Sequence, residues 1–294
     1  MAQTVQKTSL KEDITSAKCD STYYSYREQP LHLTIYFNPA EISSVEASKD
    51  DIYIVIDVMR ATTTLAVMFD QGATQVLAAQ TLEQAYSAAQ KVPGRLLCGE
   101  RHTKIPPGFD HGNSPADFAR LDLTGRELIL TTSNGTRALF ACPQQSHCLA
   151  GSFYNAEAVV THALMLAREW GTNISLVCAG EYGYFSLEDS ACAGYLALEL
   201  LRRNPNLKVS DSTHAAITLY ESYPPARLRE FTRSARELIA GGQEQDLAFC
   251  LNKNVSKNVP MVIGQDQDTG LLTVVVSIPN GNARPLQYSG LFQS

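Results

Sequence analysis

Short apolar runs alternate with helical stretches along almost the whole of this sequence. The densest run, residues 52–58 (IYIVIDV), is typical of a central strand that is buried on both faces. Residues 127–132 and 174–178 form similar runs, whereas residues 155–170 and 187–203 have apolar side chains at helical spacing. Strands that alternate with helices pack in layers. We therefore predict an α/β fold with a layered, largely buried sheet.

Local signals predict the remaining elements. Further strands are predicted at residues 31–37, 74–80 and 95–99 and in the runs MVIG and LLTVVVSI, which a QDQDTG turn separates. Further helices are predicted at residues 61–71, from Thr81 to about residue 91, within residues 133–142, and over residues 211–252 with breaks at Pro224-Pro225 and Gly241-Gly242. Residues 1–30 are polar and aperiodic, and we expect a flexible extension there.

The composition excludes several classes of protein. Hydrophobic residues make up 44% of the chain, which rules out global disorder, and the formal net charge of -6 has the wrong sign for non-specific binding to nucleic acid or anionic membranes. No apolar run approaches the roughly 18 residues that span a bilayer, and the N-terminal sequence lacks a signal-peptide core. We expect a cytoplasmic protein. The 7 cysteines have no repeated spacing, which favours free thiols, and Cys142, Cys148 and His147 make a poor zinc cluster.

Polar or glycine-containing segments follow four of the predicted strands. They are DVMRATTT from Asp57, GERHTKIPPGFDHGNSP from Gly99, TTSNGTRAL from Thr131 and AGEYGYFSLEDSACAG from Ala179. In open α/β sheets, ligands bind outside the carboxyl ends of the strands. If the four strands lie side by side, these segments form one composite pocket.

The first segment places Asp57 at the end of an apolar strand, with Arg60 three residues later. Burial disfavours a lone carboxylate, so Asp57 needs a metal ion or another cation beside it. Thr62, Thr63 and Thr64 follow at a predicted helix start, where free N–H groups can hold a phosphate. The structural alternative is an Asp57–Arg60 ion pair with threonines that only cap the helix. The residues alone do not separate the two interpretations.

The third segment repeats this design. Gly135 permits close approach of the backbone, Asn134 and Thr136 supply hydrogen bonds next to Ser133, and Arg137 adds a positive charge. An ordinary Asn-Gly turn is the alternative interpretation.

The second segment is a loop rich in glycine and proline, which favours a shaped site. We expect functional roles for Glu100, Arg101 and Asp110, and solvated side chains for the two histidines of the loop. Asn113 is a further polar group, and the Ser-Pro pair that follows it is typical of a helix start.

In the fourth segment, Glu188 and Asp189 fall in the first turn of a predicted helix. Carboxylates there complement the helix dipole, and Ser186 with Asp189 fits a capping box in which Asp replaces the usual Glu. The functional alternative is an oxygen-rich site for Mg²⁺, formed by these two carboxylates near Asp57 and Glu100.

Several enzyme classes lack support in the sequence. There is no P-loop pattern, no G-x-G-x-x-G, no G-x-S-x-G and no cysteine placed five residues before an arginine. The four segments instead offer oxygen ligands together with arginines, and this combination indicates metal-assisted chemistry on a small anion.

Taken together and in this order, the four segments resemble the motifs of the 2-phosphosulfolactate phosphatase family. The matching stretches are DVMRATTT from Asp57, GER from Gly99, GFDHGNSP from Gly108, TTSNGTRAL from Thr131 and FSLEDSACAG from Phe185. The resemblance runs from about Leu31 to the last strand near Ile278. The stretch HTKIPP, between Arg101 and Gly108, departs from the family pattern.

The resemblance implies a three-layer α/β/α fold with a largely buried mixed sheet, in which residues 31–294 form the catalytic region. It also implies a Mg²⁺-dependent phosphatase that releases phosphate from 2-phospho-3-sulfolactate, a step toward coenzyme M. On this interpretation Mg²⁺ is the cofactor, and its ligands are Asp57, Glu188 and Asp189. The expected catalytic residues are Asp57, Arg60, Glu100 and Asp110.

The substrate would then be a small phosphorylated anion held by arginines and hydrogen-bonding groups. Arg60 and the amides near Thr62–Thr64 are expected at the phosphate, the turn at residues 133–137 at a second anionic group, and Arg101 at the sulfonate or carboxylate. The expected substrate-binding residues are Thr62, Thr63, Thr64, Arg101, Asn113, Ser133, Asn134, Gly135, Thr136 and Arg137.

Two alternatives to this function stay open. One is a phosphatase for another small phosphorylated acid, and the other is a sensor that binds a phosphorylated ligand without turnover. The sequence gives no role to nucleic acid or membrane partners and leaves a homo-oligomer open.

Overall fold

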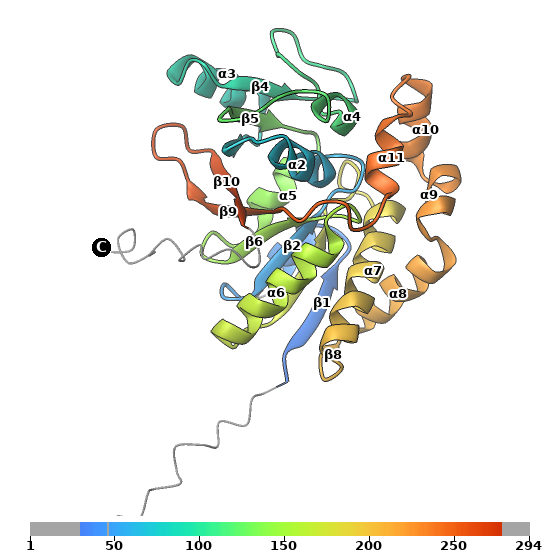
Figure 1. Ribbon diagram of the computed structural model, residues 1–294. Helices are drawn as coiled ribbons and strands as arrows, with labels where there is room; N and C mark the ends of the chain where they lie inside the picture. The colour runs from blue at the N-terminus through green and yellow to red at the C-terminus, as the bar shows by residue number, and fades with distance from the viewer. Residues whose placement is uncertain (1–29, 46, 278–294) are drawn as a thin grey trace, which may run out of the picture.

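The computed structural model describes residues 30–45 and 47–277, so almost all of the predicted extension over residues 1–30 lies outside the described residues. Within them, ten strands form one mixed sheet and eleven helices surround it (Figure 1). The strands are β1 (His32–Tyr36), β2 (Ile52–Ile56), β3 (Gln75–Ala78), β4 (Leu96–Gly99), β5 (Glu127–Thr131), β6 (His147–Gly151), β7 (Ile174–Cys178), β8 (Lys208–Val209), β9 (Val259–Gln265) and β10 (Leu272–Ser277). The helices are α1 (Ala40–Ser44), α2 (Ala61–Asp70), α3 (Leu82–Lys91), α4 (Pro115–Phe118), α5 (Gly135–Ala141), α6 (Ala156–Trp170), α7 (Leu187–Arg203), α8 (Asp211–Ser222), α9 (Pro225–Phe231), α10 (Arg233–Ala240) and α11 (Asp246–Leu251).

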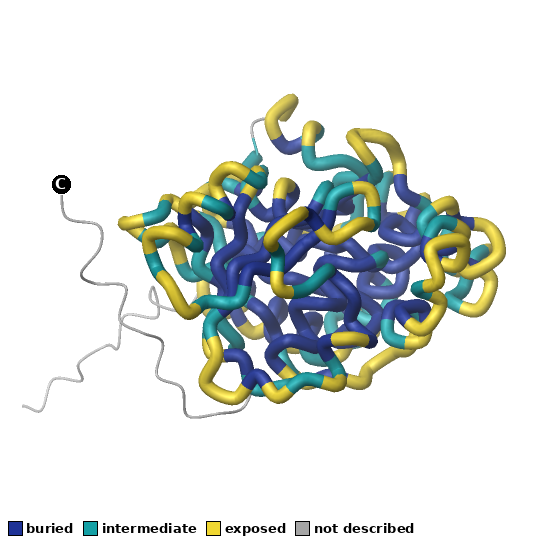
Figure 2. Tube along the Cα trace, turned by 90° about the horizontal axis from the view of Figure 1, so that it is seen from above, coloured by how far each residue is buried: buried dark blue, intermediate teal, exposed yellow. Residues whose placement is uncertain are grey.

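Helices cover both faces of the sheet. The first face carries α6, α7 and α8 over β1, β2, β6 and β7, and the opposite face of β2, β5 and β6 packs against α2 and α5. The outer face of β3, β4 and β5 packs against α3. Figure 2 shows buried chain through the middle of the molecule and exposed loops around its rim. The predicted three-layer α/β/α fold with a largely buried mixed sheet is confirmed.

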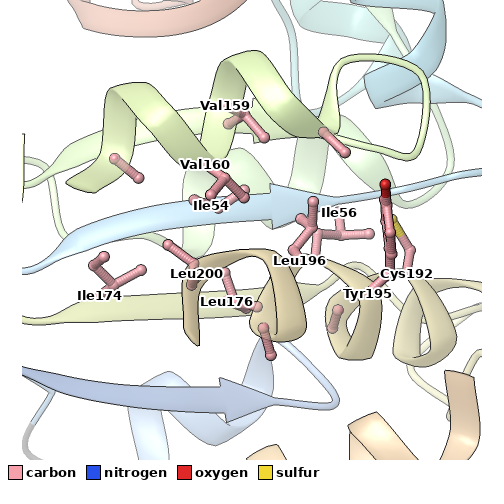
Figure 3. Close-up of a cluster of buried hydrophobic side chains, with 14 of the residues drawn as sticks. Ile54, Ile56, Val159, Val160, Ile174, Leu176, Cys192, Tyr195, Leu196 and Leu200 are labelled. Carbon is pink, nitrogen blue, oxygen red and sulfur yellow. The ribbon is translucent and has the colours of Figure 1, made fainter. Parts of the chain in front are cut away.

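Strand β2 shows why the dense apolar run becomes a central strand. Its side chains alternate, so Ile54 and Ile56 pack against Leu196 and neighbouring side chains of α6 and α7 (Figure 3). Tyr53 and Val55 belong to the core on the other face of the sheet, around α2. All of these side chains are buried, and each contributes about 1.5–3 kcal/mol to folding.

Most predicted elements are present with nearly the expected ends. Thr81 caps α3 in a capping box with Gln84, and the helices after residue 211 break at both expected places. The elements that the sequence patterns did not predict are β6, β8 and α1. Strand β6 mixes His147 and Gly151 with small residues, so it lacks a strand signature, yet it is mostly buried and pairs with β2. Long-range pairing, and not local propensity, makes this segment a strand.

The sheet consists of two sets of parallel strands that run in opposite directions. In one set β2 lies between β6 and β7, and in the other β5 lies between β3 and β4. The antiparallel strands β9 and β10 join β6 to β3. From β4 to β7, the sheet has the same connectivity when it is followed from either edge. The unit β6–α6–β7 of one half corresponds to β3–α3–β4 of the other half, and β2–α2 corresponds to β5–α5. The two halves are therefore related by an approximate two-fold axis that passes between β9 and β10.

Helices α2 and α5 lie between these two halves. Residues 61–69 of α2 are all buried. The core around the two helices contains side chains from both halves, such as Val55 of β2 and Leu130 of β5. The sheet therefore bends around α2 and α5 (Figure 1).

Cysteine environments agree with the prediction of free thiols. The six cysteines of the described residues are free and buried. Burial raises the pKa of the Cys178 and Cys192 thiols well above the ordinary value, which disfavours reactive thiolates. No helix in residues 30–45 or 47–277 is long and apolar enough to cross a membrane.

Gly194 marks a close approach of α7 to α8. A Cβ atom at this position would collide with the main-chain carbonyl of Ala216. We expect Gly194→Ala to lower the free energy of unfolding by about 1–3 kcal/mol, because overpacking outweighs a gain of about 1 kcal/mol in helix propensity. Urea denaturation measures this change. The exposed substitution Ala215→Ser on α8 is the control, with an expected change below about 0.5 kcal/mol. A Gly194→Ala protein as stable as the parent would contradict the tight packing.

Candidate active site

A cleft opens where the carboxyl ends of both strand sets meet. Its walls come from the segments after β2, β4, β5 and β7 and from α10. The lining residues are Asp57, Met59, Arg60, Glu100, Thr103, Asn113, Ser133, Asn134, Glu181, Tyr182, Ser234, Glu237 and Leu238. The expectation of one composite pocket is confirmed, but the four strands are not all neighbours. Strand β2 pairs with β7 and β4 pairs with β5, and the bend of the sheet brings the two pairs together.

Asp57 lies at the end of β2, and only 8% of its surface is exposed. Its Oδ1 atom accepts a hydrogen bond from the N–H of Ala61 (3.2 Å), the first residue of α2. Its Oδ2 atom lies against Gly135 at the start of α5, where a Cβ atom would come within 2.5 Å of it. Gly135 thus permits a close approach, and the approaching group is the Asp57 carboxylate.

The environment of Asp57 disfavours its charged form. Burial raises the pKa of Asp57 to about 7; Glu100 and Glu188 add to the increase, whereas the Ala61 N–H and Arg60 oppose it. Burial, with the charges of Asp57 and Glu188, also raises the pKa of Asp189 well above its ordinary value. A group of buried carboxylates of this kind favours a divalent cation among them.

Asp189 and Glu188 occupy the first turn of α7 but have different surroundings. Asp189 Oδ1 accepts from the Val58 N–H (2.9 Å) and Oδ2 from the Gly180 N–H (3.1 Å), which ties α7 to the ends of β2 and β7. Ser186 Oγ accepts from the Asp189 N–H (3.2 Å), so one half of the expected capping box is present and the carboxylate bonds elsewhere. Glu188 is 5% exposed and makes no side-chain hydrogen bond within the described residues.

Arg60 pairs with Asp246 of α11 and not with Asp57. Its Nη1 atom lies 2.7 Å from Asp246 Oδ2, and both side chains are almost completely buried. The Asp57–Arg60 ion pair considered above is therefore not formed. Arg60 still lines the cleft, and it is the one arginine or lysine among the described residues that line it.

The three threonines after Arg60 build the turn that carries it. The hydroxyls of Thr62, Thr63 and Thr64 donate to main-chain carbonyls. The N–H groups of Thr62 and Thr64 also donate to main-chain carbonyls. Their role in holding a phosphate stays a prediction.

Glu100 belongs to the other half of the molecule and is held in a fixed orientation. Its carboxylate accepts from the Ser133 N–H (2.8 Å), the Thr103 N–H (2.9 Å) and the Ser133 hydroxyl (3.3 Å). Arg101 donates to the Glu100 carbonyl (2.7 Å) and to Thr131 Oγ1 (2.8 Å), so it stabilises the same loop from outside the cleft.

The structure places three other predicted residues outside the cleft. Asp110 is exposed, and its carboxylate accepts from the Leu97 N–H (2.7 Å) on edge strand β4. Thr136 forms hydrogen bonds with Thr132 that close the turn before α5. Arg137 is exposed on α5. Their catalytic or substrate-binding roles stay predictions without support from this geometry.

Two equivalent turns meet above the cleft. The turn after β4 carries His102 and the turn after β7 carries Tyr182, both with a left-handed backbone (φ 52° and 50°). Their rings stack with centroids 5.5 Å apart, and the Tyr182 hydroxyl lies 3.1 Å from His102 Nδ1. The Tyr182 N–H also donates to Asn134 Oδ1 (3.0 Å), so the two halves are linked at this point.

Sequence reasoning missed part of the cleft wall. The missed residues are Met59, Thr103, Glu181, Tyr182, Ser234, Glu237 and Leu238. Glu181 had a usable signal, because it stands in the fourth polar segment directly after a glycine. The α10 residues had none, since they lie in a helical stretch without a motif.

The residues present fit a magnesium ion that also contacts the substrate. No group of three His, Cys, Asp or Glu side chains in the described part of the chain is arranged to hold a metal ion by itself. Mg²⁺ commonly takes one or two carboxylates and completes its shell with water and phosphate oxygens. Asp57 and Glu188 offer two buried carboxylates. Asn113, which is 3% exposed, adds an Oδ1 atom that has no hydrogen-bond partner in the described residues.

Comparison with known proteins decides the family. A family model described as 2-phosphosulpholactate phosphatase matches residues 36–265. The chain belongs to this family. All the motif segments that line the cleft fall within the matched residues, and the family is one of phosphoric monoester hydrolases.

Individual relatives extend the similarity over most of the chain. A Thermotoga maritima protein named probable 2-phosphosulfolactate phosphatase is 36% identical over 212 residues, which cover 71% of this chain and 88% of that protein. A protein of the same name from Deinococcus radiodurans is 36% identical over 226 residues, or 76% of this chain and 92% of that protein. The corresponding protein from Carboxydothermus hydrogenoformans is 33% identical over 230 residues, or 78% and 92%.

The raised pKa of Asp57 predicts how the stability of the metal-free protein depends on pH. Unfolded Asp57 loses its proton near pH 4, whereas folded Asp57 keeps it to about pH 7. Asp57 therefore opposes folding increasingly as the pH rises between these values, by about 4 kcal/mol at pH 8. We expect Asp57→Asn to remove this cost, so the variant is more stable than the parent at pH 8 and similar to it at pH 4.

Urea denaturation in EDTA at the two pH values measures this difference. The exposed substitution Asp268→Asn is the control and should change stability little at either pH. An Asp57→Asn protein less stable than the parent at pH 8 would mean that Asp57 serves mainly to stabilise the fold.

Proposed function

We propose that this chain hydrolyses 2-phospho-3-sulfolactate to 3-sulfolactate and phosphate, with Mg²⁺ as cofactor, in a step toward coenzyme M. The observation that carries the proposal is the cleft that the buried carboxylates of Asp57 and Glu100 line together with Arg60, with Glu188 close to Asp57. Membership of the 2-phosphosulfolactate phosphatase family and the names of the relatives support the same activity.

Asp57 and Glu188 are the residues that would hold the metal. Both carboxylates are buried, and neither has hydrogen bonds to all of its oxygens from the described residues. When bound, Mg²⁺ supplies positive charge to the phosphate oxygens and lowers the cost of charge build-up as the P–O bond breaks. Asp189 holds the start of α7, which carries Glu188, in place, because its two oxygens already accept main-chain hydrogen bonds from Val58 and Gly180.

Arg60 and Glu100 act on the reacting group from opposite halves of the molecule. Arg60 holds the phosphate, since a guanidinium stays charged at any working pH and binds phosphate oxygens bidentately. Glu100 accepts a proton from the attacking water, whose oxygen bonds to phosphorus as the P–O bond to the substrate breaks, and the released alkoxide takes a proton from solvent. The Ser133 and Thr103 N–H groups keep the Glu100 carboxylate in one orientation. Ser133 and Asn134, which line the cleft, contact the carboxylate or sulfonate of the substrate.

One observation favours a second candidate, a phosphatase for another small phosphorylated acid. The stretch HTKIPP, which departs from the family pattern, contributes Thr103 to the wall of the cleft and His102 to the turn above it. A change in this stretch therefore alters the surface that faces the substrate.

Phosphate release from a panel of substrates tests both candidates. We expect release from 2-phospho-3-sulfolactate in the presence of Mg²⁺, loss of release in EDTA, and recovery with Mn²⁺. The Asp57→Asn variant is the control for contaminating phosphatases. Faster release from 2-phospholactate or another phosphorylated acid would favour the second candidate. Binding of the panel without release would favour the sensor, and full turnover after exhaustive chelation would exclude a metal role.

Adjacent carboxylates at the start of α7 should behave differently when neutralised. We expect Glu188→Gln to raise the Mg²⁺ concentration for half-maximal activity about 10- to 100-fold, with little loss of stability in EDTA. Asp189→Asn should instead lower the free energy of unfolding at pH 4 by about 1–3 kcal/mol, because an amide NH₂ cannot accept from both the Val58 and Gly180 N–H groups and the substitution removes no buried charge at this pH. Magnesium titrations and urea denaturation of both variants provide the comparison. If Asp189→Asn weakened Mg²⁺ activation and Glu188→Gln lowered stability, Asp189 would be the metal ligand and Glu188 the structural residue.

A further inference from the structure

Asp246 is a buried carboxylate that none of the sequence motifs includes. It is the first residue of α11, and 1% of its surface is exposed. Its Oδ2 atom accepts from Arg60 Nη1 (2.7 Å), and its Oδ1 atom accepts from the Ser114 hydroxyl (2.6 Å) and the Ala116 N–H (3.2 Å). One side chain therefore connects the turn after β2, the start of α4 and the helices that precede β9.

The donors around Asp246 are enough to stabilise a buried charge. A buried ion pair is costly unless additional hydrogen bonds satisfy the remaining oxygen positions, and Asp246 has three donors on two oxygens. Such a pair adds little net stability compared with apolar packing, but it holds the planar guanidinium in one direction. Arg60 lines the cleft whereas Asp246 does not, so the carboxylate orients Arg60 from behind.

The position of Asp246 in the fold adds to this argument. Helices α8–α11 have no counterpart in the other half, where α4 leads directly to β5. This addition supplies Ser234, Glu237 and Leu238 of α10 to the cleft wall and places Asp246 behind Arg60. Through Ser114, Asp246 also contacts the residue that follows Asn113, another lining residue.

We propose that Asp246 is a positioning residue that directs Arg60 at the phosphate and makes phosphate binding depend on helices α8–α11. The inference rests on the proposed function, in which Arg60 holds the phosphate. It predicts that Asp246 acts on the phosphate part of any substrate and not on its acid part.

The test compares the affinity of Asp246 variants for inorganic phosphate, measured by isothermal titration with Mg²⁺ present. Asp246→Asn keeps an oxygen that can accept from Ser114 and Ala116 but presents an NH₂ group to Arg60. We expect its phosphate affinity to fall about 10- to 100-fold, and its kcat/KM to fall by similar factors on 2-phospho-3-sulfolactate and on 2-phospholactate. Asp246→Glu keeps the charge and compensates Arg60, so it folds even if Asp246→Asn does not, and it should still weaken phosphate binding because it displaces the guanidinium.

Two further variants separate positioning from general destabilisation. Gln245→Ala removes the neighbouring contact to Arg120 between α11 and α4, and it should leave phosphate affinity unchanged. In an Arg60→Gln background, Asp246→Asn should have no additional effect on phosphate affinity, because its action passes through Arg60.

The outcomes distinguish this inference from the proposed function. Parental phosphate affinity in folded Asp246→Asn and Asp246→Glu proteins, or an undiminished effect of Asp246→Asn without Arg60, would overturn the inference. A parent protein that binds no phosphate at millimolar concentration would also overturn it. If the parent binds phosphate but does not hydrolyse 2-phospho-3-sulfolactate, the proposed function fails, while the affinity comparison still tests the role of Asp246.

Discussion

The bend of the sheet around α2 and α5 is the constraint on which the cleft depends. In a flat sheet, two sets of parallel strands that run in opposite directions would have their carboxyl ends at opposite edges. Here the two sets enclose a shared core, and their carboxyl ends face one cleft. The starts of α2 and α5 touch at Ala61 and Gly135, directly beside the Asp57 carboxylate. The packing that determines the bend therefore also determines the position of the main candidate catalytic group.

The approximate two-fold axis relates the backbones of the two halves but not their functional side chains. Ser114 and Ser186 cap α4 and α7 in the same way. The position that corresponds to Glu188 nevertheless carries Ala116, so only one half brings a carboxylate to this place. The other half contributes Glu100 and hydrogen-bonding groups of its turns. One half thus carries the acidic groups suited to a cation, and the other carries groups suited to water and substrate.

Functional residues are predicted most accurately where they directly follow a strand or helix that the local sequence pattern identifies. Asp57 follows a strand that its apolar run alone identifies, and the polar segment after it does line the cleft. Asp110 has similar sequence signals, but it faces solvent at the sheet edge because the loop folds back along β4. Strand β6 and Asp246 could not be predicted, since one becomes a strand only by pairing with β2 and the other contacts Arg60 across 186 residues of chain. Such contacts depend on the completed fold, and no local pattern encodes them.

The strand order also has a consequence for how the chain reaches its native state. Strands β9 and β10 are the last two strands in the described residues, yet they occupy the middle of the sheet, between β6 and β3. During synthesis, one edge of β3 stays unpaired until β10 (Leu272–Ser277), almost 200 residues later in the chain, has been made. Exposed edges of this kind pair readily with other chains. Because β9 and β10 join the two halves of the sheet only at the end of synthesis, the nascent chain is exposed to premature self-association.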